Sequence, residues 1–210
     1  MLMRASTGAL ALGCGSTGRA SSAPEFVESA VSELYMITGA AGSGKTTTGL
    51  ALAERLGCVW LDLDDATESL VREYLLANPD VTEPQALSAL RPARYRLLSD
   101  CARAQWGSDP DSVVVLIAPF TAEVSSPERW ADWLGELGVA EDQAHLVWLA
   151  ISPAERLRRL AARGESRDAE AVAGGSLPEP ITPAVPALVL DAGLGVEQQV
   201  DLVLQRFGNA

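Results

Sequence analysis

The chain has 210 residues, 48% of them hydrophobic and 21% charged, and its formal net charge at pH 7 is −12. This size and composition suit one well-buried globular domain and argue against a disordered chain or a second independent core. The acidic balance disfavours a nucleic-acid partner, because such proteins usually present a basic face. No apolar run approaches the ~20 residues that span a bilayer, so no membrane partner is expected.

The first 25 residues are rich in Gly, Ser, Ala and Thr, which predicts a disordered tail at 1–25 before a folded domain at 26–210. The apolar stretch at 9–12 is shorter than the ~7–15 residues of a signal-peptide core. The three cysteines, Cys14, Cys58 and Cys101, lack metal-ligand spacing, and their odd number fits reduced thiols better than a disulfide framework. A cytoplasmic protein is therefore expected.

Beyond the tail, short apolar runs alternate with longer amphipathic segments. The apolar runs predict strands at 33–38, 58–64, 112–120, 144–152 and 187–193. The amphipathic segments predict helices at 44–57, 66–80, 83–106 with a break near Pro92, 126–138, 153–164 and 196–207. Such alternation implies right-handed βαβ crossovers, and hence a three-layer α/β/α domain built on a five-stranded parallel sheet.

The segment between the first strand and the first helix carries the strongest motif. Gly39–Thr46 is GAAGSGKT, which fits G-x-x-x-x-G-K-[ST] in the context that this motif requires and predicts a P-loop NTPase fold. Small residues let the backbone N–H groups converge on phosphates, and the helix that follows adds the positive end of its dipole. We expect Lys45 to bridge the β- and γ-phosphates of ATP and the Thr46 hydroxyl to ligate Mg²⁺. The residues expected to bind the nucleotide are Gly39, Ala40, Ala41, Gly42, Ser43, Gly44, Lys45, Thr46 and Thr47.

Three aspartates follow at the end of the second predicted strand, where open α/β sheets bind ligands. Asp62 and Asp64 are two apart, so in a strand both would face the cleft. We expect Asp62 to organise the metal and Asp64 to bind the acceptor hydroxyl and accept its proton. The alternative for Asp64 is a helix cap, the role that we favour for Asp65, before a helix that begins near Ala66.

The third predicted strand ends in Ala118-Pro119-Phe120, where a standard Walker B ATPase would carry an acidic residue. This disfavours a motor or an AAA-type ATPase and leaves the metal to Asp62. The guanine-specifying Asn-Lys-x-Asp run is also missing from the sequence, which disfavours a GTPase.

A basic helix and the loop after it offer candidates for stabilising the charge of phosphoryl transfer. Its arginines are Arg156, Arg158, Arg159, Arg163 and Arg167. Of these, Arg156, Arg159 and Arg163 share one helix face by their spacing. A mobile loop that carries an arginine would also exclude water, which competes with the acceptor. The alternative is a solvated basic surface.

The stretch GAAGSGKTTTGLALAERLGCVWLDLDD at 39–65 resembles the small-molecule kinases of the P-loop superfamily: shikimate kinase, gluconate kinase, chloramphenicol phosphotransferase and the adenylate-kinase-like group. The likeness extends loosely over 34–207. It implies that Asp62 works with the metal and Asp64 holds the substrate hydroxyl. It also implies a lid at about 160–176, in which Arg159 and Arg163 face the nucleotide and Arg167 faces the transferred phosphate or the substrate.

The acceptor itself is left open by these patterns. The glycine triplet that binds shikimate is replaced by Ala118-Pro119-Phe120, and the histidine and lid pattern of gluconate kinase are missing from the sequence. Three arginines, Arg91, Arg94 and Arg96, lie in the region that binds the acceptor in such kinases. We expect Arg94 above all to bind a carboxylate or phosphate of the acceptor.

Remaining aromatic and sulfur side chains are expected to be structural. They are Trp106, Trp130, Trp133, Trp148, His145, Cys58 and Cys101. The function favoured by the sequence is an ATP-dependent kinase that acts on a hydroxyl of a small metabolite or antibiotic, as a monomer or homodimer. The alternatives are a regulatory or assembly ATPase without a small-molecule acceptor and, disfavoured by the net charge, a polynucleotide 5′-hydroxyl kinase.

Overall fold

A computed structural model describes residues 33–164, 168, 172–175, 177 and 180–208 of the protein. The predicted tail and Arg167 lie outside these residues. The five predicted strands are all present, as β1 (Glu33–Gly39), β2 (Val59–Asp62), β3 (Val113–Ile117), β4 (Ala144–Ala150) and β5 (Leu188–Asp191). They form one sheet in the order β2-β3-β1-β4-β5, and every neighbouring pair is parallel.

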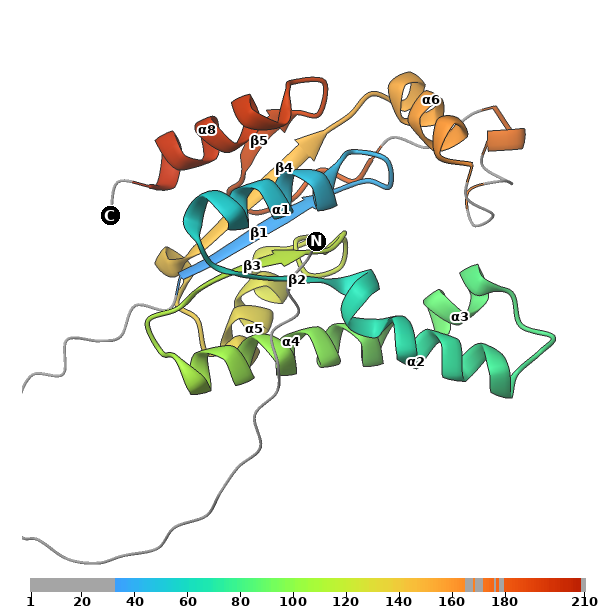
Figure 1. Ribbon diagram of the computed structural model, residues 1–210, viewed down its shortest axis with the longest axis horizontal. Coiled ribbons are helices and arrows are strands. Elements are labelled where there is room, and N and C mark those ends of the chain that lie inside the picture. The colour runs from blue at the N-terminus through green and yellow to red at the C-terminus, as the bar shows by residue number, and fades with distance from the viewer. Residues whose placement is uncertain (1–32, 165–167, 169–171, 176, 178–179, 209–210) are drawn as a thin grey trace, which may run out of the picture.

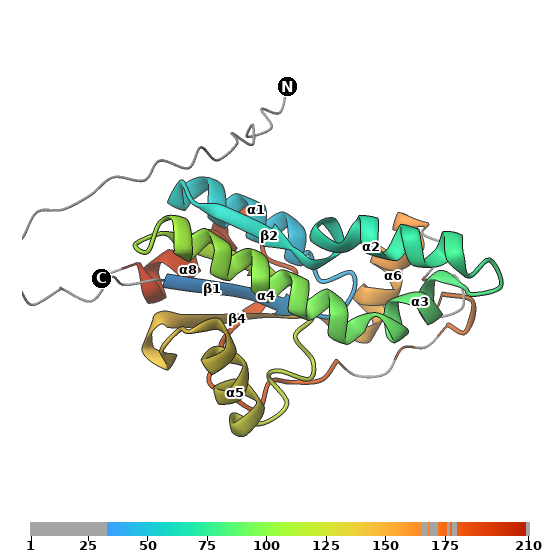
Figure 2. The ribbon, with the colours of Figure 1, turned by 90° about the horizontal axis from the view of Figure 1, so that it is seen from below.

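Helices connect the strands as the alternation predicts. They are α1 (Lys45–Leu56), α2 (Leu63–Ala77), α3 (Glu83–Ala89), α4 (Arg91–Ser108), α5 (Pro127–Leu137), the short 3₁₀ helix η1 (Glu141–Gln143), α6 (Pro153–Arg163) and α8 (Val196–Phe207). Figure 1 shows α1 and α8 above the sheet and α4 and α5 below it, and Figure 2 looks onto the α4 side. The predicted three-layer α/β/α architecture is confirmed.

Each face of the sheet has its own core, because alternate residues of the central strand β1 point to opposite sides. Leu34 and Met36 pack with α2, α4 and α5, whereas Tyr35 and Ile37 pack with α1 and α8. Helix α1 lies close to the sheet at Gly49, where an added Cβ would be 2.4 Å from a side-chain carbon of Ile117. Among the described residues, no helix has the length and apolar character needed to cross a bilayer.

Local sequence features mark the ends of several helices. Gly57 and Gly138 adopt the left-handed conformation after α1 and α5, and the Ser126 hydroxyl caps the start of α5 by accepting the backbone N–H of Arg129. The expected break near Pro92 occurs at Leu90, between α3 and α4.

The prediction was wrong at the end of β2. The strand ends at Asp62 rather than continuing to Asp64, and α2 begins at Leu63. The physical reason is an N-cap: the Asp62 side chain accepts the backbone N–H of Asp64 at 2.9 Å, which turns the chain directly into the helix. Asp62, not Asp65, therefore caps α2. These elements place α2, α3 and α6 at the end of the sheet where β1 runs into the P-loop (Figures 1 and 2).

Candidate active site

The P-loop is a tight turn that glycine makes possible. Gly39, Gly42 and Gly44 have φ values of 146°, 83° and 95°, a region that other residues rarely adopt. At Gly39 an added Cβ would also be 2.8 Å from the backbone oxygen of Leu149. Among the described residues, no side chain caps the start of α1 at Gly44. The first N–H groups of α1 are therefore available to an anion such as a phosphate.

Two P-loop side chains, those of Lys45 and Ser43, differ in their contacts. The Lys45 ammonium donates to the backbone oxygen of Ala40 at 3.1 Å, so its side chain folds back along the loop. The Ser43 hydroxyl is buried, and within the described part of the chain no hydrogen-bond partner is found for it. A loop with open N–H groups and a cation fits ATP phosphates.

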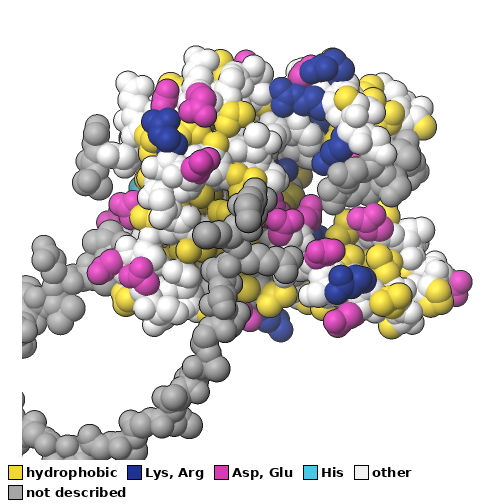
Figure 3. All heavy atoms as spheres, viewed as in Figure 1, with side chains coloured by type: hydrophobic (Ala, Val, Ile, Leu, Met, Phe, Trp, Pro, Cys, Tyr) yellow, Lys and Arg dark blue, Asp and Glu magenta, His cyan; other side chains and the backbone are white. Residues whose placement is uncertain are grey.

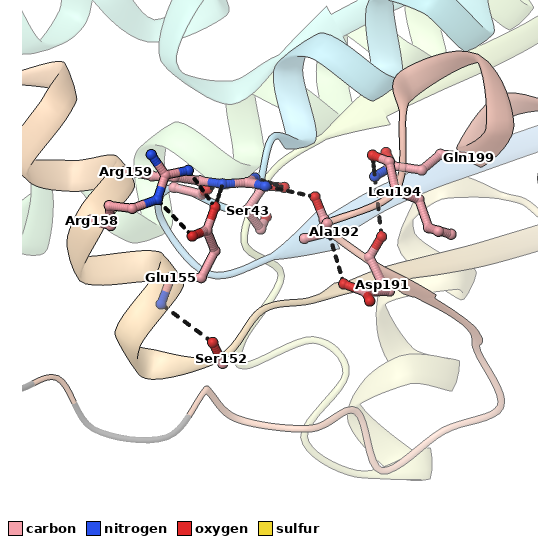
Figure 4. Close-up of polar contacts among 11 residues, drawn as sticks. Ser43, Ser152, Glu155, Arg158, Arg159, Asp191, Ala192, Leu194 and Gln199 are labelled. Carbon is pink, nitrogen blue, oxygen red and sulfur yellow. Dashed lines mark hydrogen bonds and ion pairs between the residues drawn. The ribbon is translucent and has the colours of Figure 1, made fainter.

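Helix α6 is held against the P-loop by two arginines. The Arg156 Nε donates to the backbone oxygen of Ala41 at 3.2 Å. The guanidinium of Arg159 donates to the backbone oxygens of Gly42 and Ser43, both at 3.4 Å, and to that of Ala192 at 2.8 Å. Figure 4 shows Arg159 extending from α6 between the P-loop and the segment after β5. Arg159 thus connects α6 with the P-loop and with the segment after β5.

Arg159 is itself oriented by an acidic neighbour. Its Nε donates to Glu155 at 2.7 Å, and Arg158 binds the same carboxylate through two hydrogen bonds of 2.7 Å (Figure 4). These bonds from Arg158 and Arg159 lower the pKa of Glu155 to about 2. Glu155 is therefore ionised at neutral pH and fixes both arginines.

Thr46 and Asp62 meet at the expected metal site. The Thr46 hydroxyl donates to Asp62 Oδ2 at 2.8 Å, which brings two oxygen ligands from different elements together. Among the described residues, no group of three or more His, Cys, Asp or Glu side chains could hold a metal by itself. This set fits Mg²⁺, which typically takes one or two protein oxygens and completes its shell with phosphates and water.

Asp64 lies beside this pair but in a different setting from the one predicted. It belongs to the first turn of α2, and its carboxylate accepts from Arg94 of α4 at 2.5 Å. The Arg94 side chain is 7% exposed, and its Nε donates to the Thr67 hydroxyl at 2.8 Å. Arg94 thus contacts Asp64, a pairing that neither spacing nor composition reveals. The expectation that Arg94 binds the acceptor stays a prediction.

The end of β3 is shaped by backbone contacts instead of a carboxylate. The Thr38 hydroxyl donates to the backbone oxygen of Pro119 at 2.6 Å. Phe120 follows with a φ of 46°, rare for a non-glycine residue, and its N–H donates to the Tyr95 hydroxyl at 3.0 Å. Tyr95 in turn lies under the guanidinium of Arg91, 4.2 Å from its ring centroid. Of these residues Pro119 lines the cavity beside the P-loop, and no local pattern in the sequence indicates these contacts.

These residues surround one cavity of about 660 Å³. It brings together candidate residues from the P-loop, β2, α2, α4 and α6: Lys45, Thr46, Thr47, Asp62, Asp64, Arg94, Arg159 and Arg163. Arg163 forms an ion pair with Asp168, a partner that the sequence analysis did not consider. By contrast, Arg91 and Arg96 line a different cleft, between α4 and α5. The predicted catalytic role of Arg167 concerns a residue outside the described part of the chain.

The expected structural residues are largely in the cores. Trp106, Trp130 and Trp133 are buried on the α4 and α5 side, whereas Trp148 is half-buried. His145 stacks on Phe207 with ring centroids 4.6 Å apart. The two described cysteines, Cys58 and Cys101, are each half-buried. Burial raises the pKa of Cys58 to about 11, so this thiol is protonated at neutral pH.

A family profile described as an AAA domain matches residues 36–173. The chain belongs to this family. That description names a type of domain and not a reaction. That Ala118-Pro119-Phe120 at the end of β3 disfavours an AAA-type ATPase therefore stays a prediction.

Curated relatives of the chain are shikimate kinases. The enzyme of Synechococcus sp. (strain CC9605) is 29% identical over 127 residues, 60% of this chain and 54% of that protein. The enzyme of Synechococcus elongatus is 27% identical over 128 residues, 61% of this chain and 57% of that protein. The chain thus spans about half the length of the curated relatives it matches. The resemblance to P-loop small-molecule kinases is confirmed.

Solved structures of kinases share the fold. The APS kinase CysC of Mycobacterium tuberculosis, solved with AMPPNP and APS, has a TM-score of 0.58 and 20% identity, covering 85% of this chain and 98% of its own. A gluconokinase from Sinorhizobium meliloti 1021 has a TM-score of 0.52 and 16% identity, and the match covers 85% of this chain and 93% of the gluconokinase chain. At such identities the likeness concerns the fold.

Proposed function

We propose that the chain is an ATP-dependent kinase that transfers the γ-phosphate to a hydroxyl group of a small metabolite or antibiotic. The observation that carries this proposal is the meeting of three parts in one cavity: the P-loop with Lys45, the pair of Thr46 and Asp62, and the carboxylate of Asp64. A phosphate cradle alone suits any NTPase. A carboxylate positioned beside it for a second substrate is what a kinase adds.

The P-loop and Arg159 are proposed to hold and orient the nucleotide. Lys45 neutralises the β- and γ-phosphates, and the N–H groups at the start of α1 bind their oxygens. Bound through Thr46 and Asp62, Mg²⁺ would supply charge neutralisation at the phosphates. Arg163, at the end of α6, is proposed to face the transferred phosphate. Arg159 donates to the P-loop backbone, to Glu155 and to Ala192, so its proposed role is to orient the P-loop around the nucleotide.

Asp64 is proposed to bind the acceptor hydroxyl and accept its proton. The hydroxyl oxygen forms a bond to the γ-phosphorus, the bond from that phosphorus to the β–γ bridging oxygen breaks, and ADP leaves with the electron pair. Arg94 contacts the Asp64 side chain at 2.5 Å and is proposed to orient it toward the acceptor hydroxyl. The shikimate kinases and the APS kinase act on different acceptors by their names, so they support the reaction type and leave the acceptor open.

A coupled ADP-release screen tests the proposal. The panel contains hydroxylated metabolites, amino acids, amino alcohols, sugars, and aminoglycoside and phenicol antibiotics, each with Mg·ATP. We expect one chemical class to raise ADP release at least tenfold above the rate with no acceptor, with the phosphorylated product visible by mass spectrometry. Slow ADP release that no acceptor changes would contradict the proposal and support the regulatory ATPase. Lys45→Ala serves as the control for contaminating kinases.

A further inference from the structure

A second hollow opens beside the catalytic cavity, between α2 and α3, with a volume of about 530 Å³. Its wall shares Asp64, Leu87 and Arg94 with the catalytic cavity. The two spaces therefore meet at the proposed acceptor-binding carboxylate. A molecule whose hydroxyl lies at Asp64 would extend from there into this α2–α3 groove.

The floor of the α2–α3 groove is apolar. It is formed by Val71, Leu75, Leu76 and Leu87, and Leu76 is 77% exposed. Figure 3 shows hydrophobic side chains among acidic ones at the end of the molecule that carries α2 and α3. Contact with an apolar ligand would remove this surface from water, so the groove favours an acceptor with an apolar body.

The rim of the groove is acidic. Four carboxylates, Asp64, Asp65, Glu68 and Glu83, face two guanidinium groups, Arg72 and Arg94. Arg94 pairs with Asp64 at 2.5 Å, and Arg72 lies 3.9 Å from Glu68. Within the described part of the chain, no ion-pair partner is found for Asp65 or Glu83. The groove thus presents two uncompensated negative charges.

The charges around Asp65 repel one another. Partial burial, followed by the nearby Asp62, Asp64 and Glu68, raises the pKa of the Asp65 carboxyl. A cation bound at this rim would relieve the repulsion, whereas an anion would add to it. The rim therefore discriminates against acceptors that carry a carboxylate or a phosphate.

The buried arginine does not reverse this preference. Arg94 is 7% exposed, its Nε donates to the Thr67 hydroxyl, and its Nη2 donates to the Asp64 carboxylate. An anionic acceptor that took over either of these bonds would leave the Thr67 hydroxyl or the Asp64 carboxylate without its arginine partner. The remaining cation on the groove, Arg72, is 61% exposed and beside Glu68, so it offers an anion little binding energy.

We propose that the acceptor is an amphipathic amino alcohol. This inference rests on the proposed kinase function. Its apolar body lies on Val71, Leu75 and Leu87, and its ammonium group lies at Asp65 and Glu83. Its hydroxyl lies at Asp64, forms the new oxygen–phosphorus bond as ADP leaves, and gives its proton to the Asp64 carboxylate.

Two compounds with the same benzyl body test the charge preference. Phenylalaninol carries an ammonium group beside its hydroxyl, and 3-phenyllactate carries a carboxylate there. Both are titrated by calorimetry into the full chain with Mg²⁺ and AMPPNP, with ethanolamine as the probe that lacks the apolar body. We expect phenylalaninol to bind at least tenfold more tightly than either of the others. Equal or tighter binding of 3-phenyllactate, or no binding of phenylalaninol, would overturn the proposal.

Variants of the rim and floor locate the binding. Asp65→Asn and Glu83→Gln should each weaken phenylalaninol about two- to fivefold and leave 3-phenyllactate unchanged or improved. Leu87→Ala should weaken both compounds. The matched control is Glu73→Gln, which removes one charge from an exposed position of α2 away from the groove. Equal effects of Glu73→Gln and Asp65→Asn would overturn the rim assignment, because both would then act through net charge.

Failure of this proposal differs from failure of the kinase function. Preferred turnover of an anionic acceptor in the ADP-release screen would overturn the amino-alcohol class and leave the kinase in place. Transfer to no hydroxyl compound would overturn both, even if the calorimetry shows the charge preference of the groove.

Discussion

The guanidinium of Arg94 lies 2.5 Å from the carboxylate of Asp64, and it is the buried member of the pair, 7% exposed against 54%. This contact joins α4 to the first turn of α2, and both residues line the cavity beside the P-loop. Arg94→Lys keeps the charge but loses the planar donor set that serves Asp64 and Thr67 together. We expect kcat to fall about 10²-fold, as for a displaced reacting group, with nearly unchanged ATP binding.

A purely structural role of Arg94 predicts a different result. The unfolding free energy would fall by about 1–3 kcal/mol for lost buried hydrogen bonds, with kcat per folded molecule unchanged. Steady-state kinetics and thermal unfolding of Arg94→Lys separate the two. Arg96→Lys, an exposed position two residues along α4, is the matched control and should change neither quantity.

The second prediction concerns Asp64 itself. Asp64→Asn keeps the shape of the side chain and removes the proton acceptor, so kcat should fall about 10²–10⁴-fold. Asp62 caps α2, so the substitution leaves the cap in place. Nucleotide binding, measured by titration with AMPPNP, should stay near wild type. A kcat close to wild type would remove Asp64 from the mechanism and favour proton transfer to the γ-phosphate.

The fold could be predicted from the sequence because its signals are local. The alternation of apolar runs and amphipathic segments, the glycine at 57 and the Ser126 cap each act within a few residues, and the structure confirms the elements they predict. The P-loop could also be located, because its function lies in the backbone of eight consecutive residues. Only the contacts between the P-loop and α6 could not be predicted without the structure.

The acceptor side could not be predicted in the same way. The contact of Arg94 with Asp64 joins residues thirty positions apart, through the packing of α4 on α2. The end of β2 was misplaced because strand periodicity treats Asp62 and Asp64 as equivalent, whereas a single hydrogen bond from the Asp64 N–H makes Asp62 the cap of a helix. Phe120 has a left-handed φ, and its N–H donates to the Tyr95 hydroxyl, a contact that no local pattern indicates.

The third prediction tests the metal site. In Asp62→Asn the amide oxygen can still cap α2, since Asn is as good a cap as Asp, and the amide nitrogen can donate to the Thr46 hydroxyl. The negative charge and one carboxylate oxygen are lost. We expect the Mg²⁺ concentration for half-maximal activity to rise about 10–100-fold, with little change in melting temperature. The measurement is the rate against Mg²⁺ at saturating ATP. An unchanged Mg²⁺ dependence would place the metal elsewhere.

Lys45→Ala is the fourth prediction. The substitution removes the cation from the phosphate cradle, and the half-buried side chain leaves no core cavity behind. We expect turnover to fall at least 10²-fold, the scale of losing one group that stabilises developing charge, while the melting temperature stays near wild type. If more than a tenth of wild-type transfer survived, the measured activity would not arise from this P-loop.

The last prediction uses the chain's single histidine as a probe of packing and pH. His145 of β4 stacks on Phe207 and lies 4.8 Å from the Tyr35 ring, centroid to centroid. Burial lowers the pKa of His145, the nearby Arg206 lowers it further, and Glu33 opposes both effects. Because one histidine gives one imidazole resonance, an NMR titration of the full chain should show a midpoint below 6.5, the ordinary value.

The same shift sets the sign of a stability change. Between the lowered pKa of the folded protein and the ordinary pKa of the unfolded chain, the unfolded chain binds more protons at this residue. The stability that depends on neutral His145 is therefore fully present above pH 6.5. The free energy of unfolding decreases as the pH falls through that window. His145→Phe keeps an aromatic ring against Phe207 and cannot titrate, so its unfolding free energy should depend less steeply on pH between 7.5 and 5.5 (about one unit either side of the ordinary histidine value). Urea unfolding of both proteins across this range measures the difference, and parallel curves would show that His145 titrates alike in the folded and unfolded states.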